Sequence, residues 1–241
     1  KYIDVYYRVG GNRFYLDLGD IASYCSDEGA LIVITNPNNP TGAYTPIKIL
    51  VSAFERCRAR VLIDEVYAEL CSECPVELLH SAPENVIFVR SLTKWLSVPG
   101  MRIGFAYTSS TDLARKLNIV RQPWNVNSIA ECVFTEVLRQ KHVLLKFLKE
   151  SRELIDVERR NLSAELKSLG FRVFDSVTNF LLVDLGFNAD TLTDILRYKG
   201  IAVRSCSSFR GLGPSYIRIS VRLPHENRYL IEVLRAAVNR G

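Results

Sequence analysis

Short apolar runs alternate with amphipathic stretches over the first half of the chain. Four runs have the length and aliphatic content of strands: Ala30–Thr35, Val61–Asp64, Val86–Arg90 and Ile103–Thr108. Between the first two, Pro46–Arg58 repeats its apolar residues at helical spacing. Strands that are apolar throughout and alternate with helices predict an α/β fold, with a mostly parallel sheet covered by helices on both faces.

The second half has a different pattern. From Asn127 to Ser168 apolar residues recur at helical spacing, and Gly170 is a stop signal. Beyond it, short strands mix with two helices: Phe171–Phe174, Phe180–Asp184, Thr191–Lys199, Ala202–Arg204, Ile217–Val221 and Glu226–Val238. We therefore predict two domains, a large one over residues 1–150 and a small α+β domain over residues 151–241.

Charge and hydropathy narrow the class of protein. The net charge of +5 comes from 31 basic and 26 acidic residues, which are mixed along the chain. A nucleic-acid binder usually concentrates its basic residues, so we expect no nucleic-acid partner. Apolar runs such as Ala30–Ile34 are too short to span a bilayer, so we expect no membrane partner.

Cysteine usage bears on metals and on the compartment. Of six cysteines, Cys71 and Cys74 alone are closely spaced, and no second pair or histidine pair completes a zinc set. We expect no metal site. The scattered cysteines favour reduced thiols in a cytoplasmic protein, and a redox pair at Cys71 and Cys74 is the alternative.

A rigid turn follows the first predicted strand. It reads Asn36-Pro37-Asn38-Asn39-Pro40-Thr41-Gly42, and its prolines and glycine exclude a helix. The turn is compatible with a purely structural role, or with holding an asparagine amide toward a site. Ligands of parallel sheets bind beyond the carboxyl ends of the strands. We therefore expect this turn and the two segments described next to form one site.

The second segment, Asp64-Glu65-Val66-Tyr67, ends another apolar strand. A carboxylate at the end of a buried strand is costly unless a cation or donor meets it. A protonated pyridine nitrogen would be such a partner for Asp64, and Tyr67 could direct its hydroxyl to the same ring. The alternative is that Asp64 caps the next helix.

The third segment, Ser91–Gly104, supplies an amine at Lys94 just past a strand. A lysine becomes reactive when it is desolvated or near another cation. Arg102 could provide that cation while pairing with a phosphate, and Ser91 could donate a hydroxyl to the same phosphate. A solvated loop lysine is the structural alternative.

Together and in this order, the three segments resemble the class I/II aminotransferase family, the fold-type-I enzymes that use pyridoxal 5'-phosphate. The resemblance covers essentially the whole chain. It implies that Lys94 forms a Schiff base with the cofactor and later moves a proton between Cα and C4′. It also implies that Asp64 pairs with the pyridine nitrogen, and that Tyr67 and Asn39 bond the phenolic oxygen.

The resemblance assigns the anionic groups as well. Ser91 and Arg102 would hold the cofactor phosphate, and Arg218 would clamp the substrate α-carboxylate as a planar fork. An extra arginine is expected for a substrate phosphate, with Arg204 and Arg210 as candidates. Asn179 is expected to border the site, or else to hydrogen-bond the backbone.

Within the family the chain is similar to histidinol-phosphate aminotransferases and threonine-phosphate decarboxylases. Three segments favour the decarboxylase: Ser91–Trp95, Gln122–Asn127 and Val203–Gly213. The resemblance thus implies decarboxylation of a phosphorylated amino acid such as L-threonine O-3-phosphate. Transamination of histidinol phosphate and an inactive family member with a binding role are the alternatives. The reaction depends on which Cα bond stands perpendicular to the cofactor ring, and a carboxylate held in the ring plane by Arg218 would favour transamination.

The family also carries a long segment before the Asn36–Gly42 turn. That segment contains a small-residue loop for the phosphate, an aromatic ring over the pyridine and a tyrosine offered across a homodimer. Here residues 1–35 precede the turn, and the single methionine is Met101. We therefore expect a large domain that is incomplete at its N-terminus, and a homodimer as the assembly.

Overall fold

The computed structural model of the 241-residue protein describes residues 2–74 and 82–238. Its contacts group into two compact units, and each is described by itself. The central unit contains Asp17–Pro37 and Tyr44–Ser151. The C-terminal unit contains the described residues up to Leu16, Asn38–Ala43 and the described residues from Arg152 onward. The predicted domain boundary between residues 150 and 151 stays a prediction. Two segments from the first half of the chain belong to the C-terminal unit: the described residues up to Leu16, and Asn38–Ala43, which includes the middle of the Asn36–Gly42 turn.

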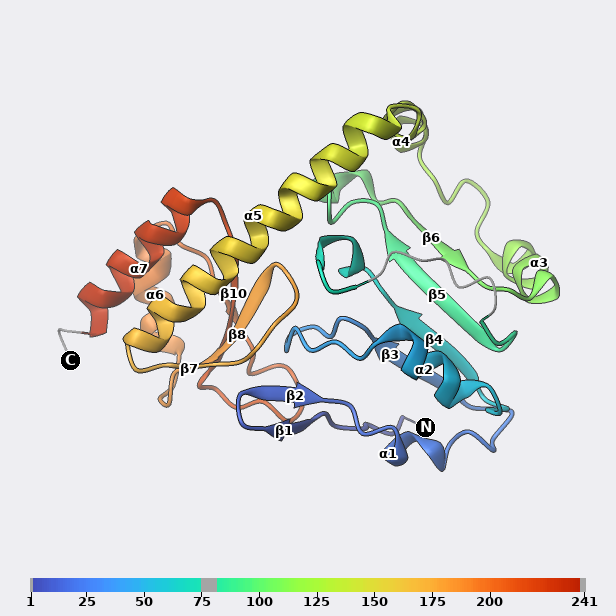
Figure 1. Ribbon diagram of the computed structural model, residues 1–241, viewed down its shortest axis with the longest axis horizontal. Coiled ribbons are helices and arrows are strands. Elements are labelled where there is room, and N and C mark those ends of the chain that lie inside the picture. Colours follow the sequence, from blue (N-terminus) through green and yellow to red (C-terminus); the bar gives the residue numbers. More distant parts are fainter. Residues whose placement is uncertain (1, 75–81, 239–241) are drawn as a thin grey trace. The chain divides into compact units, whose positions relative to one another are not determined.

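The central unit holds a four-stranded sheet in the order β3-β4-β5-β6 (Figure 1). Its strands are β3 (Leu31–Thr35), β4 (Arg60–Asp64), β5 (Val86–Ser91) and β6 (Gly104–Tyr107). The first three run parallel, and β6 is antiparallel to β5. All four lie within two residues of the runs that predict them.

The helix α2 (Ile47–Phe54) joins β3 to β4 and buries its apolar residues Ile47, Leu50, Val51 and Phe54. Coverage of the sheet is uneven at β3. Ile34 is buried, whereas Leu31 and Val33 are 59% and 61% exposed. Because side chains alternate along a strand, one face of β3 is open in the described part of the chain. An apolar run does not show which elements pack over it, so this exposure could not be expected from the sequence.

The other helices of the central unit are short, except for the last. They are α1 (Gly19–Ala22), η1 (Ala68–Leu70), η2 (Pro99–Met101), α3 (Thr111–Val120), α4 (Ser128–Arg139) and the start of α5 (Lys141–Ser168). The predicted helical stretch over Asn127–Ser168 is thus two helices, divided at Gln140. Sequence patterning missed α3, which buries none of its residues and has no apolar face against the core.

The C-terminal unit contains an antiparallel sheet in the order β7-β8-β10-β9. Its strands are β7 (Arg172–Val173), β8 (Phe180–Asp184), β9 (Arg204–Ser205) and β10 (Tyr216–Ser220), and its helices are the end of α5, α6 (Asp190–Tyr198) and α7 (Pro224–Val238). A hairpin of β1 (Arg8–Gly10) and β2 (Arg13–Tyr15), which the apolar pattern did not indicate, packs with this unit.

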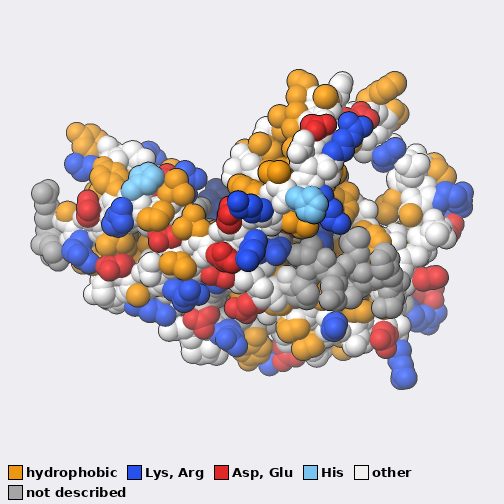
Figure 2. Space-filling view, turned by 45° about the horizontal axis from the view of Figure 1, so that its top comes forward, with side chains coloured by type: hydrophobic (Ala, Val, Ile, Leu, Met, Phe, Trp, Pro, Cys, Tyr) orange, Lys and Arg blue, Asp and Glu red, His pale blue; other side chains and the backbone are white. Residues whose placement is uncertain are grey.

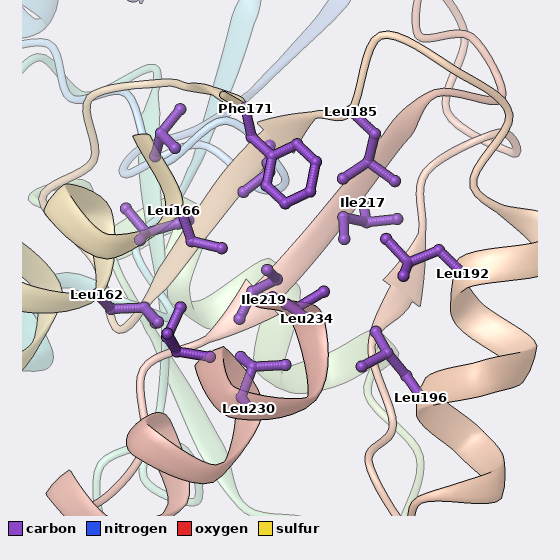
Figure 3. Close-up of a cluster of buried hydrophobic side chains, with 14 of the residues drawn as sticks. Leu162, Leu166, Phe171, Leu185, Leu192, Leu196, Ile217, Ile219, Leu230 and Leu234 are labelled. Atoms are coloured by element: carbon purple, nitrogen blue, oxygen red, sulfur yellow. The ribbon is translucent and has the colours of Figure 1, made fainter. Parts of the chain in front are cut away.

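The two faces of this sheet are different. Ile217 and Ile219 of β10 point into a core built with leucines of α5, α6 and α7 (Figure 3). On β8, Leu182 joins a second cluster with Phe14, Phe174, Ala43, which follows the turn, and Cys206, which follows β9. Because side chains alternate, Arg218 lies on the face away from the helices, as does its strand partner Leu182.

The cysteines correct an expectation. Disulfides join Cys25 to Cys57 and Cys71 to Cys74, while Cys132 and Cys206 are free thiols. The prediction of reduced thiols is therefore wrong for Cys25 and Cys57, and at Cys71 and Cys74 the alternative of a pair is the one that the structure shows. Two backbone amides, those of Arg58 and Ala59, donate to the Cys25 carbonyl and bring Cys57 beside it. This contact joins residues far apart in sequence, so spacing carried no signal for it.

The described residues contain no helix that is long and apolar enough to cross a membrane. They also contain no group of three or more side chains placed to hold a metal ion. Basic and acidic side chains are interspersed on the face shown in Figure 2.

Candidate active site

The Asn36–Gly42 turn starts in the central unit as an extension of the sheet. The backbone amide of Asn36 donates to the carbonyl of Asp64 (2.8 Å), so pairing of β3 with β4 continues one residue past β3. The buried Asn36 side chain exchanges two 2.8 Å hydrogen bonds with the backbone of Thr45. This side chain therefore holds the turn together and is not available to a ligand.

The middle of the turn belongs to the C-terminal unit. Asn38 accepts a 2.7 Å hydrogen bond from the Thr41 hydroxyl, and its backbone bonds Ala43 and Gly42. Asn39 differs from both other asparagines, because its Oδ1 accepts from Nη1 of Arg218 at 2.5 Å. The side chains of Asn36 and Asn38 thus bond within or next to the turn, whereas that of Asn39 bonds a residue outside it. Asn39 is also the asparagine that the family resemblance assigns to the site.

Gly42 is required at the end of this turn, which gives a testable prediction. Its φ is +71°, and an added Cβ would lie 2.1 Å from Oγ of Ser176. We expect Gly42→Ala to reduce the free energy of unfolding by about 3 kcal/mol, from overpacking and a left-handed backbone. Gly186→Ala is the control, because Gly186 has φ +77° with no atom within 4 Å of its Cβ position. Equal losses for the two variants in urea unfolding would contradict the steric argument.

Asp64 ends β4 as a half-buried carboxylate. Its Oδ1 accepts from the Val66 amide at 3.0 Å. The residue that precedes η1 is Tyr67, without a side-chain cap, so Asp64 does not cap a helix. Burial raises the pKa of Asp64, while the Val66 amide and the charge of Lys94 act in the opposite direction. A carboxylate in this setting is stabilised by a further cation.

Ser91 ends β5 next to a hydroxyl that the sequence reasoning missed. The Ser91 and Thr93 hydroxyl oxygens lie 2.8 Å apart, and the Thr93 amide donates to Ser91 Oγ at 3.2 Å. The Ser-x-Thr spacing before Lys94 was the available signal. Gly104 faces Ser91 on β6, where a Cβ would lie 2.5 Å from the carbonyl oxygen of Arg90. The two strands therefore approach closely beside the hydroxyl pair.

Lys94 and Arg102 lie at the two ends of the loop that connects β5 to β6, and both are exposed. The loop is folded by a bond from the Ser97 amide to the Lys94 carbonyl. Arg102 has a left-handed backbone with φ of 49°, and its Nη1 donates to the Pro99 carbonyl at 3.3 Å. Because β6 returns antiparallel to β5, Arg102 comes back to the end of β5 that carries Ser91.

In the C-terminal unit, Arg218 and Arg204 are direct partners on the antiparallel strands β10 and β9. Two cations in this position repel unless an anion lies between them. Arg218 also lies 5.0 Å from the centre of the Phe180 ring, and its Nε is buried without a hydrogen-bond partner among the described residues. Nη2 of Arg204 donates to the Ser208 hydroxyl at 3.1 Å.

The other two candidates of this unit differ in their surroundings. Arg210 forms an exposed ion pair with Asp4 at the surface. This pairing favours Arg204 over Arg210 as the second anion-binding arginine. The side-chain oxygen of Asn179 is buried and has no hydrogen-bond partner among the described residues.

The structure thus brings Asp64, Ser91, Lys94 and Arg102 to the ends of adjacent central strands, with Tyr67 in the turn after β4. It groups Asn39, Asn179, Arg204 and Arg218 in the C-terminal unit. The roles of these residues remain predictions.

Comparisons with known proteins establish the family. Residues 4–234 match the model of aminotransferase class I and II. The chain is 32% identical over 227 residues to a histidinol-phosphate aminotransferase of Methanosphaera stadtmanae, covering 92% of this chain and 60% of the relative. It is 30% identical over 226 residues to a putative threonine-phosphate decarboxylase of Caldanaerobacter subterraneus, covering 89% and 59%. The chain therefore spans about three fifths of the length of these relatives.

Solved structures agree with this assignment. The histidinol-phosphate aminotransferase of Clostridium acetobutylicum superposes with a TM-score of 0.84 at 27% identity, over 94% of this chain and 68% of that one. The enzyme of Sinorhizobium meliloti, solved in complex with pyridoxal-5'-phosphate, gives 0.77 at 26% identity, over 95% and 63%. Fold and motifs define a fold-type-I transferase, and the predicted fold class is confirmed. The chain belongs to the aminotransferase class I and II family.

Proposed function

We propose that the protein to which this chain belongs uses pyridoxal phosphate to decarboxylate a phosphorylated amino acid such as L-threonine O-3-phosphate. In this proposal the central unit binds the cofactor, through Lys94, Asp64, Tyr67, Ser91 and Arg102. The C-terminal unit binds the anionic groups of the substrate through Arg218 and Arg204, with Asn179 beside them, while Asn39 donates to the phenolic oxygen.

The groups in the central unit match the chemistry of the cofactor. Asp64 is a half-buried carboxylate whose pKa is raised by burial, and a protonated ring nitrogen would supply a further cation beside Lys94. The Ser91 and Thr93 hydroxyls and the exposed Arg102 guanidinium are the donors that phosphate oxygens take. Lys94 supplies an exposed amine next to them.

The observation that carries the choice of substrate is the facing pair Arg204 and Arg218. Two guanidinium groups at one register position match a substrate with two anionic groups. A phosphorylated amino acid carries a carboxylate and a phosphate. Histidinol phosphate carries a phosphate alone, so the pair favours a phosphorylated amino acid over histidinol phosphate as the substrate.

When bound, pyridoxal phosphate supplies an electron sink for the electrons left on Cα. In the proposed reaction the bond from Cα to the carboxylate breaks and carbon dioxide leaves. The Lys94 amine, in its protonated form, then delivers a proton to Cα. Transamination is the second candidate, in which Lys94 removes the Cα proton and returns it to C4′ of the cofactor.

A homodimer remains part of the proposal. Large apolar side chains are exposed on α4 and on the start of α5, among them Ile129 at 67% and Val143 at 66%. Exposed apolar clusters mark interaction surfaces, and light scattering on the full-length protein measures the assembly.

The cytoplasmic location stays a prediction, against which the two disulfides argue.

The decisive experiment supplies the full-length protein with pyridoxal phosphate and O-phosphothreonine. We expect carbon dioxide release that needs no 2-oxo acid, and no glutamate when 2-oxoglutarate is added. Unphosphorylated threonine is the matched control. It should react at least about tenfold more slowly, because it loses charge-assisted hydrogen bonds. Glutamate formation without carbon dioxide would replace the decarboxylase with the transaminase.

A further inference from the structure

The central unit contains a buried cluster of three charged side chains, and two of them are sequence neighbours of Asp64 and Ser91. Nε and Nη2 of Arg90 lie 2.9 and 2.8 Å from Oε2 of Glu65. Nη1 of Arg90 lies 3.7 Å from Oε1 of Glu69. The side chains of Arg90 and Glu65 are only 5% and 6% exposed. A buried ion pair of this kind contributes little net stability, so its presence calls for another explanation.

The position of the cluster supplies one. Glu65 directly follows Asp64, and Arg90 directly precedes Ser91. The backbone amide of Glu65 donates to the carbonyl of Val89 at 2.8 Å, which extends the pairing of β4 with β5 beyond Asp64. Because side chains alternate, Glu65 and Arg90 share one face of these strand ends and Asp64 and Ser91 share the other.

The charges in this cluster affect Asp64. Glu65 places a second carboxylate next to Asp64. Burial and, to a smaller extent, the charge of Asp64 raise the pKa of Glu65, whereas Arg90 lowers it. Arg90 offsets this repulsion by binding Glu65 through two nitrogens. Without Arg90, the charge of Glu65 would act on Asp64 across the end of the strand, uncompensated in a region of low dielectric constant.

We propose that Arg90 is a positioning residue, which neutralises Glu65 and thereby keeps Asp64 charged and aligned for a pyridine nitrogen. This inference rests on the proposed function, because it assigns Asp64 to the cofactor ring. Arg90 itself does not touch the cofactor; it acts through Glu65 and the paired strand ends.

The test measures binding in the full-length protein. Quenching of tryptophan fluorescence gives Kd for pyridoxal phosphate and for the analogue in which a C–H group replaces the ring nitrogen. We expect R90M to raise Kd for pyridoxal phosphate by about tenfold or more. Kd for the analogue should rise by less than about threefold, because the analogue offers Asp64 no partner. R115M is the control, since Arg115 pairs with Asp112 on the surface of the same unit; it should change neither Kd.

Two further variants separate charge from packing. E65Q/R90M removes the charges of Glu65 and Arg90 and leaves that of Glu69. R90K keeps the cation but loses the fork. If Arg90 serves to neutralise Glu65, both variants bind pyridoxal phosphate within about threefold of the wild type. This comparison holds even if R90M itself does not fold.

Three results would overturn the inference. One is an equal loss of affinity for pyridoxal phosphate and for the analogue in R90M, which would indicate that Arg90 has a structural role alone. Another is R90M behaving like R115M, and the third is E65Q/R90M and R90K both losing affinity. A wild type that binds pyridoxal phosphate with no effect of Arg90 rejects this inference and leaves the proposed function standing. A wild type that does not bind it rejects both.

Discussion

Replacing Lys94 with alanine is expected to abolish the covalent attachment of pyridoxal phosphate to the full-length protein. The long-wavelength absorbance band of the lysine-bound cofactor should disappear. Turnover of O-phosphothreonine should fall by at least about 10⁴-fold, because the same amine holds the cofactor and moves the proton at Cα. Lys94 is exposed, so the free energy of unfolding should change by less than about 0.5 kcal/mol. Absorbance, carbon dioxide release and urea unfolding measure the three effects.

Lys48→Ala is the matched control for this prediction. Lys48 is an exposed lysine on α2 of the same unit, and its loss should leave band and turnover unchanged. A Lys94 variant that keeps the band would assign the amine to another lysine. A wild type that shows neither band nor turnover would favour the inactive family member with a binding role.

Replacing Arg218 with lysine is expected to raise KM for O-phosphothreonine by about 10- to 100-fold, which corresponds to the loss of one charge-assisted hydrogen bond. Lysine keeps the charge and loses the planar fork. The substitution would also remove the 2.5 Å hydrogen bond from Nη1 of Arg218 to Oδ1 of Asn39, and the contact of the guanidinium carbon with the Phe180 ring centre at 5.0 Å. Steady-state kinetics should show the loss in KM more than in kcat, because the clamp binds the substrate and is not a reacting group.

The control for this variant is Arg222→Lys. Arg222 follows β10 and pairs with Glu226 at the surface, where its Nε and Nη2 both donate to Oε1 of Glu226. Its replacement should change KM less than twofold. If Arg204→Lys carries the whole loss and Arg218→Lys none, the assignment of the two facing arginines is wrong and the clamp belongs to Arg204.

The strands of the central sheet could be predicted closely because their apolar runs are local signals. Val61–Asp64 predicts β4, which spans Arg60–Asp64, and Val86–Arg90 predicts β5, which spans Val86–Ser91. The burial of α2 likewise follows from its spacing. The helix α3 was missed because it buries no residue.

Long-range contacts could not be predicted from such signals. The disulfide between Cys25 and Cys57 depends on backbone bonds between segments about 30 residues apart. The exposure of Leu31 and Val33 depends on which elements pack against β3. Both are properties of the folded chain, because no local pattern specifies what lies across a sheet.

The sequence by itself determined the chemistry at each strand end: a carboxylate after β4, and hydroxyls, an amine and a guanidinium after β5. These motifs are contiguous, so one-dimensional order is enough to recognise them. Only the tertiary structure decided which asparagine of the turn reaches Arg218, which arginine stands opposite it, and that Arg90 is buried against Glu65. The physical reason is that strand register and hydrogen-bond partners are set by pairings between distant segments, and these exist only once the chain has folded.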